Sequence, residues 1–147
     1  MIEVGIPNLS TPAAIVDRII IEKLKIEEFK AKGQTELIST TEYVVGRLRT
    51  QLNLIIQSYP IIHFSEFFDL YNELIIALTI AVGQVSYFEN QKALEHKRVG
   101  ATDTAYIAHM DLLSRSYNEK RSLYKKQIDV LFKEYCKIAS DTETRTF

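Results

Sequence analysis

Apolar residues recur every three or four positions along most of the chain, which is the spacing of α-helices that bury one face. The first such stretch predicts a helix over residues 12–32. Thr11 can cap its start, Pro12 suits the first helical position, and Gly33 suits the position after its end. The expected core face comprises Ala13, Val16, Ile20 and Leu24, broadened by Ile15, Ile19 and Ile26, with Arg18, Glu22 and Lys25 on the opposite side.

Two further helices are predicted in the middle of the chain. The second covers about residues 40–57, capped by Thr40 or Thr41, or else starts earlier near Thr35, and it ends before Pro60. The third begins after Ser65 and continues to about residue 96. Its middle, LIIALTIAV (74–82), is apolar on every side, so we expect it to be central in the fold or in a subunit contact.

The fourth predicted helix, from about residue 104 to 139, has steps of four and three between its seam residues, which is heptad spacing typical of a coiled coil. At 1.5 Å per residue it spans on the order of 50 Å, whereas the first two helices reach only about 30 Å. A second subunit is the simplest cover for the remainder. The seam reads Met110, Ser114, Tyr117, Arg121, Tyr124, Ile128, Leu131, Tyr135, Ile138.

Together these elements predict an all-α protein, an antiparallel four-helix bundle in which the third and fourth helices are long. Five glycines and three prolines are too few turn residues for an all-β fold. We expect a single domain over residues 1–147, with an extended arm over 1–10 and a frayed tail over 140–147.

Composition narrows the expected setting. A net charge of −1 gives no reason to expect nucleic acid as a partner. The single cysteine, Cys136, cannot form an intramolecular disulfide, and no secretory signal pattern opens the chain, so we expect a cytoplasmic protein. The longest near-apolar run, residues 74–82, falls far short of the roughly 20 residues of a membrane span, so we expect none.

The most unusual feature is Arg121, which occupies a seam position where an apolar residue is expected, one heptad after Ser114. An inward arginine keeps its charge and needs a partner. Asp17 lies at the edge of the first helix's apolar face, so we predict an ion pair between Asp17 and Arg121. The favoured interpretation is structural, fixing helix register; the other is a site for an anion or substrate.

Other chemistry is sparse. Glu66, Asp69 and Glu73 share a helix face, and all-α nucleotide pyrophosphohydrolases hold Mg²⁺ with such carboxylates. No facing pair of acids accompanies this trio, so a solvated acidic first turn is the favoured interpretation. The three histidines have no metal-ligand spacing, and we expect no metal and no cofactor.

Two segments resemble a bacterial all-helical family of unknown function whose members lie beside, or are fused to, glycosyltransferases in surface-polysaccharide loci. They are TPAAIVDRIIIEKLKIEEF (11–29) and NEKRSLYKKQID (118–129). The resemblance covers about a fifth of the chain and implies a carbohydrate-pathway association rather than a reaction. The matching residues are Asp17, Arg18, Lys25, Asn118, Arg121, Lys125 and Ile128, and the departures are Glu119, Lys126 and Asp129.

The sequence therefore favours a binding or assembly module that forms a homodimer, with a protein or carbohydrate-pathway partner. The alternative is a small enzyme: either a Mg²⁺-dependent pyrophosphohydrolase, or a chorismate-mutase-like bundle whose inward cations would be Arg18, Arg47, Arg121 and Lys125. The candidate ligand- or anion-binding residues are Asp17, Arg18, Asn118, Arg121 and Lys125.

Overall fold

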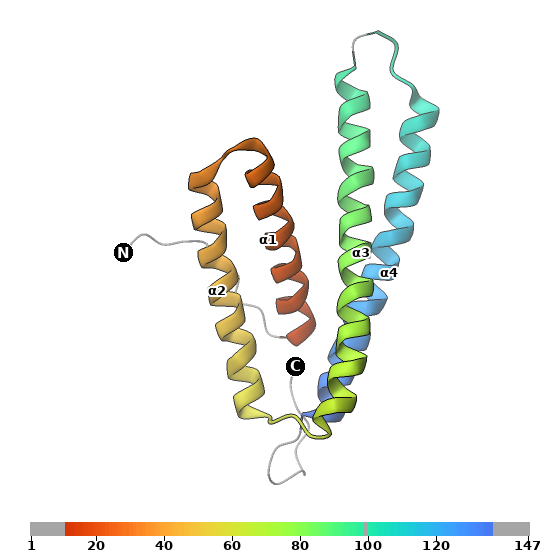
Figure 1. Cartoon of the computed structure of the whole chain (residues 1–147). Coiled ribbons are helices and arrows are strands. Elements are labelled where there is room, and N and C mark those ends of the chain that lie inside the picture. The colour runs from red at the N-terminus through yellow and green to blue at the C-terminus, as the bar shows by residue number, and fades with distance from the viewer. Residues whose placement is uncertain (1–10, 99, 137–147) are drawn as a thin grey trace.

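The computed structural model describes residues 11–98 and 100–136, and this part of the chain folds into four α-helices (Figure 1). They are α1 (Pro12–Lys32), α2 (Thr35–Ser58), α3 (Phe64–Lys97) and α4 (Thr104–Tyr135). With 34 and 32 residues, α3 and α4 are the longest. The predicted all-α bundle with two long helices is thus confirmed. The expected arm over 1–10, the tail over 140–147 and the seam position Ile138 lie outside the described residues.

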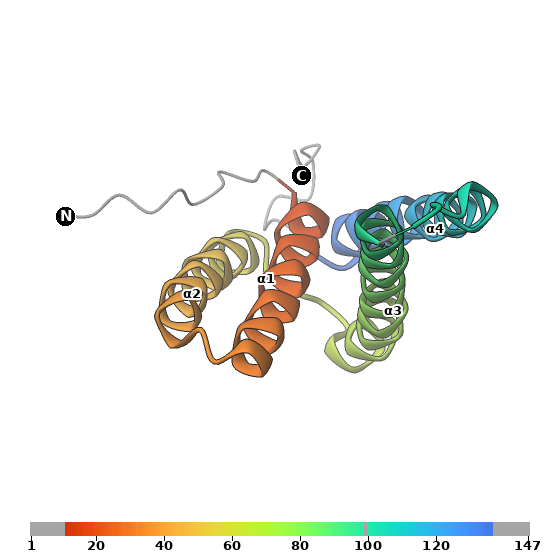
Figure 2. The same cartoon turned by 90° about the horizontal axis from the view of Figure 1, so that it is seen from above.

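The helices pair as two antiparallel hairpins, α1 with α2 and α3 with α4. Seen from above, α1 lies between α2 and the α3–α4 hairpin (Figure 2). Within the described residues, no Cα atom of α2 lies within 8 Å of one in α3 or α4. Among these residues the bundle is therefore open, and α3 contacts α4 and, less extensively, α1.

The broad apolar surface of α1 explains its central position. One face contributes Val16 and Ile20 to a core shared with α3 and α4, while the adjacent face packs Ile15 against α2. A helix that packs on two sides needs a wider apolar stripe than one on the surface of a bundle. The partners of the first face include Phe67, Leu78, Ile128 and Phe132, and those of the second are Val44 and Leu48.

Local sequence signals place the ends of the first hairpin. The Thr11 hydroxyl accepts a hydrogen bond from the Ala14 backbone N–H at 3.1 Å, and Gly33 adopts a left-handed φ of 69°. The helix α2 begins at Thr35, so the alternative start near Thr35 is confirmed and the expected cap at residue 40 or 41 is wrong. The hydroxyls of Thr40 and Thr41 instead donate to backbone carbonyls four residues earlier, as they do inside helices.

The two ends of the long hairpin are held differently. At the base, Phe67 and Phe132 meet edge to face at a centroid distance of 5.2 Å, and the Ile62 N–H donates to the Tyr135 carbonyl at 2.7 Å. At the far end, Lys92 Nζ lies 2.7 Å from Glu89 and 2.9 Å from Asp111. Polar pairs therefore help to hold the upper part of the hairpin, whose end extends beyond α1 (Figure 1).

Candidate functional site

The predicted ion pair between Asp17 and Arg121 is present and connects α1 to α4. Arg121 Nε donates to Asp17 Oδ1 at 2.9 Å, and Nη2 donates to Oδ2 at 2.6 Å. This two-point geometry matches the planar guanidinium to the carboxylate. Asp17 is only 5% exposed. Both carboxylate oxygens are thus occupied by the arginine.

Two further predicted residues join this pair from α4. The Asn118 Oδ1 accepts a 3.4 Å hydrogen bond from Arg121 Nη1, and Lys125 Nζ lies 3.8 Å from Asp17 Oδ2. The hydrogen bond with Asp17 raises the pKa of Arg121 above its already high ordinary value, so the guanidinium stays charged. Asp17 brings one negative charge against the positive charges of Arg121 and Lys125, and Arg121 engages both of its oxygens. The clearest role of this cluster is to hold α1 onto α4.

The fifth predicted member, Arg18, pairs elsewhere. Its Nε lies 2.9 Å from Glu22 Oε1, but the N–H does not point at an acceptor, so the contact is an ion pair without a hydrogen bond. Lys25 Nζ approaches the same oxygen at 3.4 Å. Glu22 is 5% exposed, so its expected position on the solvent side of α1 is wrong. Its two cations supply the pairing that a buried carboxylate needs.

Asp129 of α4 is a further contact with α1 that the sequence did not predict. Its Oδ1 accepts a 2.9 Å hydrogen bond from the backbone N–H of Ala13, in the first turn of α1. A carboxylate at a helix N-terminus satisfies an unpaired donor and complements the helix dipole. Arg121, Lys125 and Asp129 follow one another at four-residue spacing on α4. That spacing was the available signal that all three face α1.

The residues of the two enzyme alternatives are not brought together. Arg47 is exposed on α2, which lies away from α4 and from Arg121. Glu66 accepts a hydrogen bond from the Tyr135 hydroxyl at 2.6 Å, with Asp69 and Glu73 further along α3. In residues 11–98 and 100–136, no three histidine, cysteine or acidic residues are arranged to hold a metal ion.

A row of exposed apolar side chains lies on α3. Ile76, Ile80, Tyr87 and Leu94 are 62%, 56%, 54% and 61% exposed, and they recur at helical spacing on one face. The opposite face of α3 buries Leu78 and Ala81, among others. Burial of the middle of α3 within the described part of the chain therefore holds for one face only, and the other expectation, a subunit contact, stays a prediction. We call Ile76, Ile80, Gly83, Tyr87, Asn90 and Leu94 the exposed face of α3.

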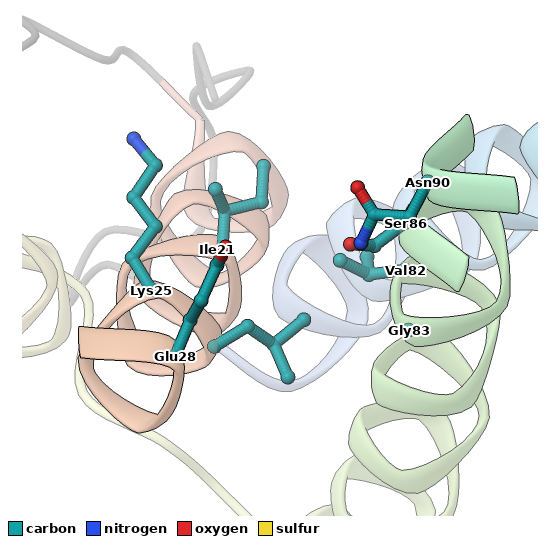
Figure 3. Close-up of a pocket in the computed structure, with 8 residues that line it drawn as sticks. Ile21, Lys25, Glu28, Val82, Gly83, Ser86 and Asn90 are labelled. Atoms are coloured by element: carbon teal, nitrogen blue, oxygen red, sulfur yellow. The ribbon is translucent and has the colours of Figure 1, made fainter. Parts of the chain in front are cut away.

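A groove of about 460 Å³ borders this face, between α1 and α3 (Figure 3). Ile21, Lys25 and Glu28 of α1 line one side, and Gly83 and its neighbours on α3 line the other. A Cβ atom placed on Gly83 would have no heavy atom within 4 Å. The exposed face of α3 is therefore continuous with an open groove.

Among the described residues, α3 is also the one helix long and apolar enough to cross a membrane, judged by length and composition alone. Residues 74–88 carry no charge, and they cover about 22 Å of helix, less than the roughly 30 Å of a bilayer core.

No known protein family, curated protein sequence or solved structure matches this chain.

Proposed function

We propose that this chain is a helical assembly module that docks another protein through the exposed face of α3. The observation that carries the proposal is the row of four large apolar side chains, each more than half exposed, on a helix whose other face is core. Exposed apolar surface gathered on one face of a helix is typical of interaction sites. Because complete burial of such a side chain contributes about 1.5–3 kcal/mol, burying the exposed half contributes about 1 kcal/mol for each.

The polar cluster around Asp17 and Arg121 supports this function indirectly. By joining α1 to α4, it positions the α1–α2 hairpin beside α3 and so forms the second wall of the groove. A ligand would have to displace the bidentate pair in order to reach Asp17. The cluster is thus better suited to holding the docking surface in shape than to binding an anion.

The proposed setting of this module is the cytoplasm. The sequence resemblance over residues 11–29 and 118–129 supports a cytoplasmic role beside enzymes of surface-polysaccharide synthesis. In that setting an assembly module brings pathway proteins together without carrying out a reaction itself. A protein partner is favoured over a membrane because the uncharged part of α3 is shorter than a bilayer core.

The experiment that tests this function is site-specific photocrosslinking in cells that naturally make the protein. A photoreactive amino acid replaces Ile80 in one variant and Leu112 in a control. Leu112 is a matched residue, 66% exposed on α4. We expect a discrete protein adduct from position 80 and none from position 112. Absence of an adduct at position 80, or equal adducts at both positions, would overturn the proposal.

A further inference from the structure

The exposed face of α3 has a pattern that is complementary to itself. When two copies of one helix pair antiparallel about a two-fold axis, residues equally distant from the axis meet. Around residue 85, Ile76 corresponds to Leu94, and Gly83 corresponds to Tyr87. Ile80 corresponds to Asn90, the one mixed pair. Ile76 and Leu94, at the two ends of this face, therefore each lie opposite an apolar residue, and the ring of Tyr87 lies opposite Gly83.

From this pattern we propose that the partner of the exposed face is a second copy of this chain, with the two α3 helices antiparallel and the two-fold axis level with Val85. The inference rests on the proposed assembly function and specifies its partner. The resulting interface is isologous, because the same surface of each copy forms it.

The charges along α3 favour the same orientation. The first turns carry Glu66, Asp69 and Glu73, whereas the last turn carries His96 and Lys97 beside Glu95, which pairs with Arg98. In the antiparallel register, Glu73 and Lys97 are equally distant from residue 85, so Glu73 of one copy lies near Lys97 of the other. A parallel pair would instead place Glu73 beside its own counterpart, and like charges disfavour wrong pairings.

Gly83 gives the pair room for close approach. The space beside it is open, since no heavy atom lies within 4 Å of a Cβ position there. Tyr87 of one copy meets Gly83 of the other in this register, and small residues allow helices to pack closely. The adjoining groove, walled by Ile21 and Leu24, extends the apolar surface available to the second copy.

The first test compares two glycine substitutions by sedimentation equilibrium. Gly83→Ala and Gly46→Ala both add a methyl group to a helix where nothing lies within 4 Å, so neither disturbs the fold of a single copy. We expect Gly83→Ala to weaken self-association at least tenfold, and Gly46→Ala to leave it unchanged. Equal dissociation constants for the two variants and the parent protein would overturn the register.

The second test reads the orientation from disulfide formation in the full-length chain. Copies carrying Ile76→Cys are mixed with copies carrying Leu94→Cys and oxidised; the native Cys136 is buried. A bridge requires Cα atoms about 4.4–6.8 Å apart, so we expect crosslinks between the two variants and none within either one. Crosslinking of Ile76→Cys with itself would contradict the antiparallel pairing.

The failures of the two proposals are distinguishable. If the protein remains monomeric at all concentrations but gives an adduct with a different protein from position 80, the self-association proposal fails and the assembly function is retained. Flotation with phospholipid vesicles that is lost in Ile80→Glu, without any protein adduct from position 80, would overturn both.

Discussion

The pair between Asp17 and Arg121 is the clearest single interaction to perturb. Replacing Arg121 with Met removes both hydrogen bonds to a carboxylate whose side chain is only 7% exposed. Removing one partner of a fully buried pair costs about 3–5 kcal/mol. The Arg121 side chain is 25% exposed, so water reaches this pair, and we expect a smaller loss of about 2–3 kcal/mol in the free energy of unfolding.

Urea denaturation measures this loss, provided that the slope with denaturant is unchanged. The control is Arg115→Met, which removes an arginine whose side chain is 76% exposed and paired only along α4 with Asp111; we expect it to cost less than about 0.5 kcal/mol. Adding Asp17→Asn to Arg121→Met removes the stranded charge, so the double variant is expected to lose less than the sum of the two single variants. A loss of under about 0.5 kcal/mol in Arg121→Met, or strict additivity in the double variant, would refute the reasoning.

Three further predictions concern other contacts. Asp129→Ala removes the acceptor of the Ala13 N–H in the first turn of α1 and is expected to cost about 1 kcal/mol, a fall of about 2–4 °C in the calorimetric midpoint. Asp129→Asn keeps an acceptor and is expected to lose less. The hydrogen bond to Glu66 raises the pKa of Tyr135 to about 12 from an ordinary 10.0. The stability that this bond contributes is therefore complete below pH 10 and is lost as pH rises toward 12. The difference between the ultraviolet titrations of the parent protein and of Tyr135→Phe should show this pKa, and Glu66→Gln should lower it. Hydrogen bonds from Lys92 lower the pKa values of Glu89 and Asp111 below their ordinary 4.5 and 3.8. The stability that these two carboxylates contribute is therefore complete above their ordinary pKa values and is lost as pH falls through their lowered pKa values in the folded protein. Urea midpoints measured across this acid range should therefore fall less in Lys92→Met than in the parent protein.

Local signals in the sequence were sufficient to predict that four helices form and that one contact joins the first helix to the fourth. Thr11, Pro12 and Gly33 act within a single turn, so their effect on α1 does not depend on the rest of the fold. Arg121 could be paired with Asp17 because a charge on an apolar seam must be neutralised, and the first helix offered an acid at the edge of its own core face.

The arrangement of the helices could not be predicted in the same way. Hydrophobic periodicity shows which face of a helix is buried, but not which helix covers it. It therefore did not reveal that the backbone of α2 lies beside α1 and away from α3 and α4, or that Glu22 lies buried between Arg18 and Lys25. For the same reason, the apolar middle of α3 indicated burial in the fold or in a subunit contact, but not that residues 11–98 and 100–136 leave one of its faces exposed.

The measurement that tests the account most directly is the molar mass in solution as a function of protein concentration, determined by static light scattering. We predict that the mass of the full chain rises from 16.9 kDa toward twice that value, and that Ile80→Glu holds it at 16.9 kDa at every concentration. A parent protein that stays at 16.9 kDa throughout, or an Ile80→Glu variant that dimerises as well as the parent, would contradict self-assembly through the exposed face of α3.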